Sequence, residues 1–274
     1  MLTPPLFTLQ RGSAPLLISV PHAGLAVPPE MEDQMTPVGQ ARADTDLFVD
    51  RLAASAPDRG VGVLVAHYSR YVVDLNRHPE GQPLYPGADE TGLVPLTSFD
   101  HQPLWYRPGG IDFVSRRQRF WAPYHAALDA ELTRIRQLHG WAVLLDLHSI
   151  PDEVPRFFSG RLPAISLGTS AGTSCAAELS EAVVTALLAG PFEMVRDQRF
   201  KGGYITRHYG RPTVGWHALQ MELTRSSYLP DDLTWCPERA AAMITTLTHV
   251  IDTVLQWRPV PGSTMEGMPA SAAR

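Results

Sequence analysis

Short apolar runs recur along this chain, and several of them carry, or lead directly into, a side chain capable of chemistry. Apolar runs of about four to eight residues are typical of buried strands. Four runs are of this kind: LLISVP (16–21) before His22, VVDL (72–75) before Asn76 and Arg77, WAVLLDL (141–147) before His148, and QMEL (220–223) around Glu222. A fold that places the ends of these strands side by side would gather two histidines, a carboxylate and an Asn-Arg pair.

The rest of the pattern alternates further predicted strands with predicted helices. Strands are expected at 16–21, 61–66, 71–75, 141–147, 164–167, 192–195 and 218–223, and helices at 46–56, 113–139, 174–188 and 238–255. Gly140 is a natural end for the long helix, and Pro123 is expected to kink or divide it. This alternation predicts an α/β fold of three layers, in which a mainly parallel, mixed sheet has helices on both faces.

One domain accounts for most of the length. Residues 1–257 are expected to form a single domain, and the tail 258–274, rich in Gly, Pro, Ser and Ala, is expected to be disordered. Residues 78–112 are rich in Pro and Gly and lack periodicity. A loop of that length within a compact domain is often functional.

The buried carboxylates strengthen the case for a site at the strand ends. Ligands of open α/β sheets bind beyond the carboxyl ends of the strands. Asp74, Asp146 and Glu222 lie inside apolar runs, and a carboxylate is rarely buried without a partner. Asp146 precedes His148 by two residues, so both point to the same side of a strand, and Asp146 could orient that histidine.

Simpler interpretations remain for single residues. A lone histidine after a strand is more often a loop or capping residue than a metal ligand. His125, inside the long predicted helix, is expected to be a packed histidine, and Arg116, Arg117 and Arg119 a solvated helix face. The pair Gly202-Gly203 indicates no more than a flexible turn.

Several other chemistries have no support in the sequence. There is no phosphate-binding loop and no GxGxxG after a strand. Cys175 and Cys236 are far apart and form no CxxC pair, so a metal would have to be held by histidine and carboxylate. The net charge of −5 and the lack of a basic stripe argue against nucleic acid as a partner. No signal peptide or membrane-spanning run is visible, so the expected location is the cytoplasm, with no membrane partner.

An ordered set of motifs gives a more specific indication. SVPHAG (19–24), ADTDLFVDRL (43–52), SRYVVDLNRHP (69–79), DLHS (146–149), KGGYITRHYG (201–210) and HALQMELTRSSYL (217–229) follow one another along most of the chain. With these motifs the chain resembles the N-formylglutamate amidohydrolase (N-formylglutamate deformylase) family. That family is similar in turn to the zinc carboxypeptidases and aspartoacylases, so the resemblance implies a zinc-carboxypeptidase-like fold.

The resemblance also implies an activity and a set of roles. The activity is metal-dependent hydrolysis of N-formyl-L-glutamate to formate and L-glutamate, a step of histidine degradation, with one zinc ion per chain and manganese or cobalt as alternatives. His22 and His148 would bind the metal, and Glu222 would be the catalytic base. The carboxypeptidase pattern has a Glu three residues after its first His, but Leu25 stands there. The third ligand is therefore expected to be Asp46 or Asp44, with Asp46 preferred.

The substrate contacts and the competing functions complete the expectation. Asn76 and Arg77 would bind a substrate carboxylate, because a guanidinium pairs with carboxylates bidentately. Arg70 and Arg207 are further candidate cations, and Tyr204 could donate a hydrogen bond. The alternatives are a hydrolase of another N-acyl amino acid and a non-catalytic carboxylate-binding protein with the same fold. The sequence does not determine the oligomeric state.

Overall fold

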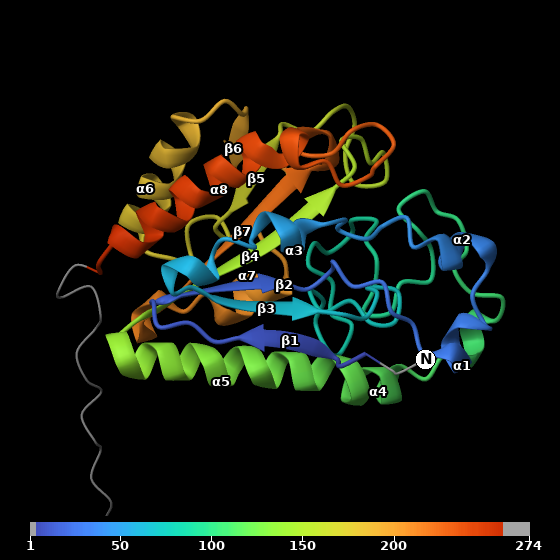
Figure 1. Ribbon diagram of the computed structural model, residues 1–274. Coiled ribbons are helices and arrows are strands. Elements are labelled where there is room, and N and C mark those ends of the chain that lie inside the picture. Colours follow the sequence, from blue (N-terminus) through green and yellow to red (C-terminus); the bar gives the residue numbers. More distant parts are fainter. Residues whose placement is uncertain (1–3, 260–274) are drawn as a thin grey trace, which may run out of the picture.

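The computed structural model describes residues 4–259 of the chain, which form a mixed sheet between two layers of helices (Figure 1). The predicted disordered tail falls mostly outside the described residues. Seven strands make one sheet in the order β1-β3-β2-β4-β7-β5-β6. Their bounds are Phe7–Gln10 (β1), Leu16–Val20 (β2), Gly62–Ala66 (β3), Ala142–Ile150 (β4), Ile165–Gly168 (β5), Met194–Arg196 (β6) and Trp216–Thr224 (β7).

The centre of the sheet is parallel and its margins are mixed. β3, β2, β4 and β7 run parallel, β1 pairs antiparallel with β3, and β5 pairs antiparallel with β7 and parallel with β6. β4 and β7 are buried along their whole length, as expected for central strands covered on both faces. The predicted three-layer α/β fold with a mainly parallel, mixed sheet is confirmed.

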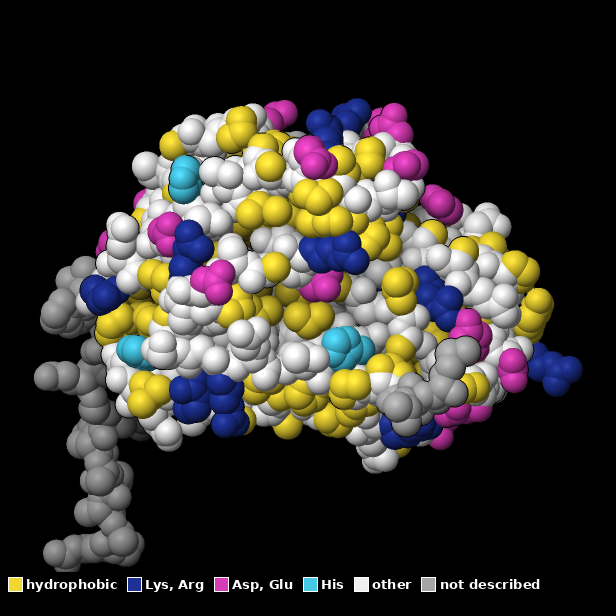
Figure 2. Space-filling view, viewed as in Figure 1, with side chains coloured by type: hydrophobic (Ala, Val, Ile, Leu, Met, Phe, Trp, Pro, Cys, Tyr) yellow, Lys and Arg dark blue, Asp and Glu magenta, His cyan; other side chains and the backbone are white. Residues whose placement is uncertain are grey.

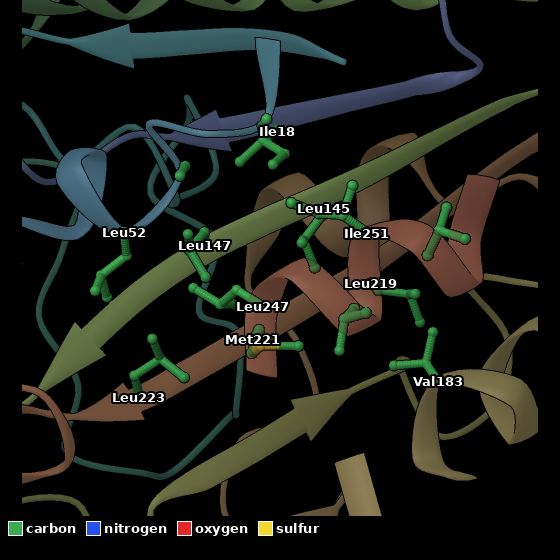
Figure 3. Close-up of a cluster of buried hydrophobic side chains, with 14 of the residues drawn as sticks. Ile18, Leu52, Leu145, Leu147, Val183, Leu219, Met221, Leu223, Leu247 and Ile251 are labelled. Atoms are coloured by element: carbon green, nitrogen blue, oxygen red, sulfur yellow. The ribbon is translucent and has the colours of Figure 1, made fainter. Parts of the chain in front are cut away.

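Alternate residues of the central strands supply the two cores. On one side Ile18, Leu145 and Leu219 pack against α3 (Val49–Leu52), α6 (Ala177–Leu188) and α8 (Pro237–Gln256) (Figure 3). On the other side Leu17 and Leu144 pack against α5 (Ala122–His139) and α7 (Tyr204–Tyr209). Successive side chains of a strand point to opposite faces, so neighbouring residues belong to different cores.

The long predicted helix is made of three consecutive pieces. α4 (Phe113–Arg116) begins at Asp112, whose carboxylate accepts the Ser115 N–H at 2.9 Å. A π-helical turn, Arg117–Trp121, leads into α5, with Pro123 in its first turn. α5 ends before Gly140, the predicted end of the helix, which has a left-handed conformation with φ of 85°.

Two predicted elements are wrong. Residues 71–75 form no strand; the segment turns, and its apolar side chains Tyr71, Val72, Val73 and Leu75 are buried in the core on the α5 side. Burial among loops and helices gives the same apolar pattern as burial in a sheet. The helix predicted at 46–56 is reduced to one turn, α3, because Phe48 before it has a left-handed backbone with φ of 57°.

The remaining short elements lie at the periphery or in connections. β1 and α7 were not expected from the sequence. α1 (Pro29–Glu32), α2 (Pro37–Ala41) and the 3₁₀ turns Pro57–Arg59, Pro108–Gly110, Pro212–Val214 and Arg225–Ser227 complete the described chain. Residues 78–107 contain no helix or strand, as the long predicted loop requires.

The surface carries no concentration of one charge on the face seen in Figure 2, where basic and acidic side chains are interspersed. Among residues 4–259, no helix combines the length and the apolar character that a membrane crossing would need.

Candidate metal centre and active site

Three buried side chains from separate parts of the chain meet at the carboxyl end of the sheet. His22 lies two residues after β2, His148 lies near the end of β4, and Asp46 lies in the turn before α3. One ligand atom from each lies within 4.8 Å of the other two. The ring centroids of the two histidines are 4.9 Å apart, and all three side chains are almost inaccessible to solvent.

Two further carboxylates hold the imidazole rings in place. His22 Nε2 lies 2.8 Å from Asp74 Oδ1, and His148 Nε2 lies 2.8 Å from Asp146 Oδ2. Each ring is therefore held through Nε2, which leaves Nδ1 facing Asp46: Asp46 Oδ2 lies 3.7 Å from His22 Nδ1 and 3.0 Å from His148 Nδ1. Carboxylates that bind the second nitrogen of a histidine in this way commonly fix its tautomer for metal binding.

Two polar atoms of this group lack a hydrogen-bond partner among the described residues. They are His22 Nδ1 and Asp46 Oδ1, and both are buried. A buried polar atom without a partner costs about 1–3 kcal/mol, so natural proteins rarely leave one unused. Two imidazole nitrogens and one carboxylate oxygen are the protein ligands of many open catalytic zinc sites. The residues present therefore fit a divalent metal ion.

The surroundings shift the pKa values of the three groups in different directions. Burial, together with the nearby Arg70 guanidinium, lowers the pKa of His22, so its ring is neutral with a free lone pair. Burial alone would also lower the pKa of His148, but the carboxylates of Asp146 and Asp46 outweigh it and raise that pKa. Burial would raise the pKa of Asp46; the hydrogen bond with His148 and the nearby positive groups lower it instead, so Asp46 is ionised.

The two candidates for the third ligand lie in different surroundings. Asp44 lies outside the group: its Oδ2 accepts the Phe99 N–H at 2.9 Å, and its own N–H donates to Tyr71 Oη at 3.3 Å. Asp46 is the carboxylate that belongs to the group with His22 and His148.

Glu222 lies beside this group on the neighbouring strand. It pairs with His148 in the parallel ladder of β4 and β7, so both side chains project from the same face of the sheet. Its carboxylate is 9% exposed and faces the cavity described below. Burial is the main cause that raises the pKa of Glu222 to about 8. Gln220 Nε2 lies 3.5 Å from Glu222 Oε2, a long contact on the same face of the strand.

Asn76 connects the two strands with α7. Its Nδ2 donates to Asp146 Oδ2 at 3.2 Å, and its Oδ1 accepts the Ile205 N–H at 2.8 Å. A Cβ on Gly203 would clash with the Asn76 amide, so only glycine fits there. This close approach explains Gly203, and a φ of 116° accounts for Gly202; the sequence alone indicated the pair only as a turn.

A cavity of about 480 Å³ opens onto these residues. His22, His148 and Glu222 line it, together with the predicted substrate contacts Arg70, Asn76 and Arg77. Its apolar wall comes from the 78–112 loop and from residues 150–200 and includes Phe99, Phe157, Phe158 and Phe200. The long loop is thus part of the site.

Two predicted substrate contacts lie outside the cavity lining. Arg207, on α7, donates to the carbonyl oxygens of Gly202 at 2.9 Å and Leu84 at 2.8 Å. Tyr204, also on α7, packs among aromatic rings that include Trp121 and His208. Both side chains hold α7 and its surrounding loops together.

Sequence reasoning missed several contacts that only the fold brings about. Asp74 was recognised as needing a partner, but nothing indicated that the partner is His22. Ser19 Oγ donates to Asp146 Oδ1 at 2.9 Å and lies 3.0 Å from Tyr124 Oη, behind the metal-binding group. A polar residue in the middle of the LLISVP run was the available signal for Ser19.

Fold and site together describe an α/β protein with a buried His-Asp-His group at the floor of a cavity, an arrangement suited to metal-assisted hydrolysis. The model of the N-formylglutamate amidohydrolase family matches residues 14–229. The chain is 41% identical over 259 residues to an N-formylglutamate deformylase of Pseudomonas aeruginosa, covering 91% of this chain and 96% of the relative. It is 39% identical over 257 residues to an N-formylglutamate deformylase of Pseudomonas putida, with the same coverage.

Solved structures agree with the sequence relatives. An N-formylglutamate amidohydrolase from Ralstonia eutropha superposes with a TM-score of 0.78 at 27% identity, covering 91% of this chain and 96% of that one. A gene product of Agrobacterium tumefaciens has the same fold, with a TM-score of 0.69 at 17% identity, covering 91% and 94% of the two chains. The chain belongs to the N-formylglutamate amidohydrolase family, and the expected enzyme class, an amidohydrolase, is confirmed.

Proposed function

We propose that this protein hydrolyses the amide bond of N-formyl-L-glutamate to formate and L-glutamate, with a divalent metal ion held by His22, Asp46 and His148. The observation that carries the proposal is the buried group itself, in which His22 Nδ1 and Asp46 Oδ1 lack partners at the floor of the cavity. The names of the relatives supply the substrate. Zinc is the proposed ion, because two imidazoles and one carboxylate suit it, with manganese and cobalt as alternatives.

A bound divalent ion would supply Lewis-acid polarisation of the formyl carbonyl and would lower the pKa of water at the site. The protein's own residues provide the rest of the chemistry. Asp74 and Asp146 hold the histidine rings by their Nε2 atoms and keep each Nδ1 directed at Asp46. This preorganisation means that the site does not have to rearrange during the reaction.

Glu222 is the proposed general base. It projects from the same face of the sheet as His148 and faces the cavity. A carboxylate whose pKa is raised by burial exchanges protons readily near neutral pH. Glu222 would take a proton from the attacking water as oxygen adds to the formyl carbon, and would deliver it to the glutamate nitrogen as the C–N bond breaks.

Arg77 is the proposed contact for a substrate carboxylate. It is partly exposed in the cavity lining and its guanidinium donates only to uncharged oxygens: Thr91 O at 2.7 Å, Thr91 Oγ1 at 3.0 Å and Asn76 O at 3.1 Å. Its positive charge is therefore not cancelled by an acidic partner. Arg70 lies deeper and is ion-paired with Asp74 at 2.7 Å, so it serves mainly to hold that carboxylate. Asn76 would orient the site through Asp146.

One experiment tests the proposal against its alternatives. The purified protein is treated with a chelator and then supplied with zinc, manganese or cobalt, and formate release from N-formyl-L-glutamate is measured beside N-acetyl-L-glutamate hydrolysis. The expected result is metal-restored formate release with one ion bound per chain. Faster hydrolysis of the acetyl compound would favour another N-acyl substrate, and binding of N-formyl-L-glutamate without turnover under any metal would favour a carboxylate-binding protein.

A further inference from the structure

Four arginines line the catalytic cavity, and two of them are already neutralised. Arg70 is paired with Asp74 at 2.7 Å and lies 3.6 Å from Asp46. Arg156 is paired with Asp89 at 2.8 Å and also donates to backbone and hydroxyl oxygens of the long loop. A substrate anion would have to displace a carboxylate to bind either of them.

The other two, Arg77 and Arg199, keep their charge available. Arg77 donates only to uncharged oxygens, as described above. Arg199 is exposed and has no hydrogen bond or ion pair with any residue in the range 4–259. Its guanidinium carbon lies 5.8 Å from the centroid of the Phe158 ring, a contact with the aromatic wall of the cavity.

The loop that carries Arg199 is pinned on both sides. Before it, the Asp197 carboxylate accepts the Thr169 N–H at 2.7 Å. After it, the Lys201 carbonyl accepts the Ser170 N–H at 2.6 Å, and the Gly203 N–H donates to Gln220 Oε1 at 2.7 Å. The backbone is therefore fixed against β5 and β7, while the Arg199 side chain remains free at the wall of the cavity.

Two unneutralised cations match the charge of the proposed substrate, which has two carboxylates. Arg77 follows Asn76, whose Nδ2 lies 3.1 Å from His148 Nε2, and the Arg77 side chain lines the same cavity. Arg199 belongs to the aromatic part of the lining, where it contacts Phe158. We propose that Arg199 binds the side-chain carboxylate of the substrate while Arg77 binds the α-carboxylate, which makes Arg199 the residue that selects dicarboxylic N-acyl amino acids.

This inference rests on the proposed function and is tested with two substrates that differ in one charge. N-formyl-L-glutamate carries the side-chain carboxylate, and N-formyl-L-glutamine replaces it with an uncharged amide. Arg199→Gln should lower kcat/KM for N-formyl-L-glutamate by about 10- to 100-fold, the range for loss of a charge-assisted hydrogen bond, mostly through KM. For N-formyl-L-glutamine the same variant should change kcat/KM by less than about threefold, because the contact is absent there.

Two further variants separate recognition from structure. Arg199→Lys keeps the charge and should retain part of the preference for N-formyl-L-glutamate. Arg161→Gln removes a charge from the neighbouring surface, outside the catalytic lining, and should leave both substrates unaffected. Thermal melting of each variant checks the fold.

The outcomes distinguish the two proposals. An equal loss on both substrates, or no loss on N-formyl-L-glutamate, would overturn the role of Arg199 while the proposed function stands. A wild-type enzyme that does not hydrolyse N-formyl-L-glutamate would overturn the proposed function, and the assignment of Arg199 with it.

Discussion

Replacing Asp46 with asparagine removes the one negative charge that faces both histidines. Asp46 Oδ2 lies 3.0 Å from His148 Nδ1 and 3.7 Å from His22 Nδ1, and it also accepts the Ser149 N–H at 3.1 Å. An asparagine side chain has the same shape, and its carbonyl oxygen can keep the bond from Ser149. The fold should therefore survive while the anionic ligand is lost.

The expected loss of metal affinity is large. Removing a residue that only orients a metal ligand typically costs about 10- to 100-fold in affinity. Asp46 would be a ligand itself, so Asp46→Asn should weaken zinc binding by about 100-fold or more, which corresponds to about 2.7 kcal/mol.

The assay is a zinc titration of chelator-treated protein, by calorimetry or against a competing indicator. Asp44→Asn is the matched control, because it removes the same charge two residues away. The Asp44 carboxylate accepts the Phe99 N–H and would not bind the metal. Full zinc affinity in Asp46→Asn, or weakened binding only in Asp44→Asn, would refute the assignment of the third ligand.

Three other predictions address the substrate, the backbone and stability. Arg77→Gln should lower kcat/KM for N-formyl-L-glutamate by about 10- to 100-fold, and an unchanged value would place the α-carboxylate elsewhere. Gly203→Ala should lower the melting temperature and kcat because its Cβ would clash with Asn76, whereas Gly109→Ala, with open space around it, should change neither. Burial lowers the pKa of His217 from 6.5 to about 4. Between these two pH values the unfolded chain binds a proton that the folded chain does not, so the stability that the neutral, buried His217 contributes is complete above pH 6.5 and is lost as the pH falls toward 4. From about pH 8 to about pH 5 the unfolding free energy of the wild type should fall by about 2 kcal/mol more than that of His217→Gln; parallel curves would contradict this.

The sequence predicted the central part of the fold well. The runs that became β2, β4 and β7 are largely apolar and are buried along their whole length, which is the pattern of strands covered on both faces. Their polar ends met at one rim because parallel strands end on the same side. The sequence alone therefore places His22, His148 and Glu222 together.

The errors arise where tertiary packing overrides local pattern. Tyr71–Leu75 has the composition of a strand, but its buried side chains pack under loops and α5. The short strand β1 alternates partly buried and exposed residues and offers too little apolar signal. The pairing of Asp74 with His22 joins residues 52 positions apart, and no local pattern encodes such a contact.

The candidate substrate contacts show the same limit. The motifs contain three candidate cations, Arg70, Arg77 and Arg207. Whether each guanidinium can bind a substrate carboxylate depends on the protein groups that it already contacts. Arg70 meets Asp74, and Arg207 meets two backbone carbonyls. No local feature of the sequence marks Arg199, because its lack of a partner among residues 4–259 depends on the three-dimensional fold.

The most direct test of the mechanism is a paired measurement on Glu222→Gln, in which metal content and turnover are determined on the same sample. The substitution keeps the shape of the side chain and removes its basic oxygen. The variant should bind one metal ion per chain and still bind N-formyl-L-glutamate, yet release formate at least about 100-fold more slowly than the wild type. Loss of the metal would make Glu222 a ligand instead of the base, and a near-normal kcat would remove it from the mechanism.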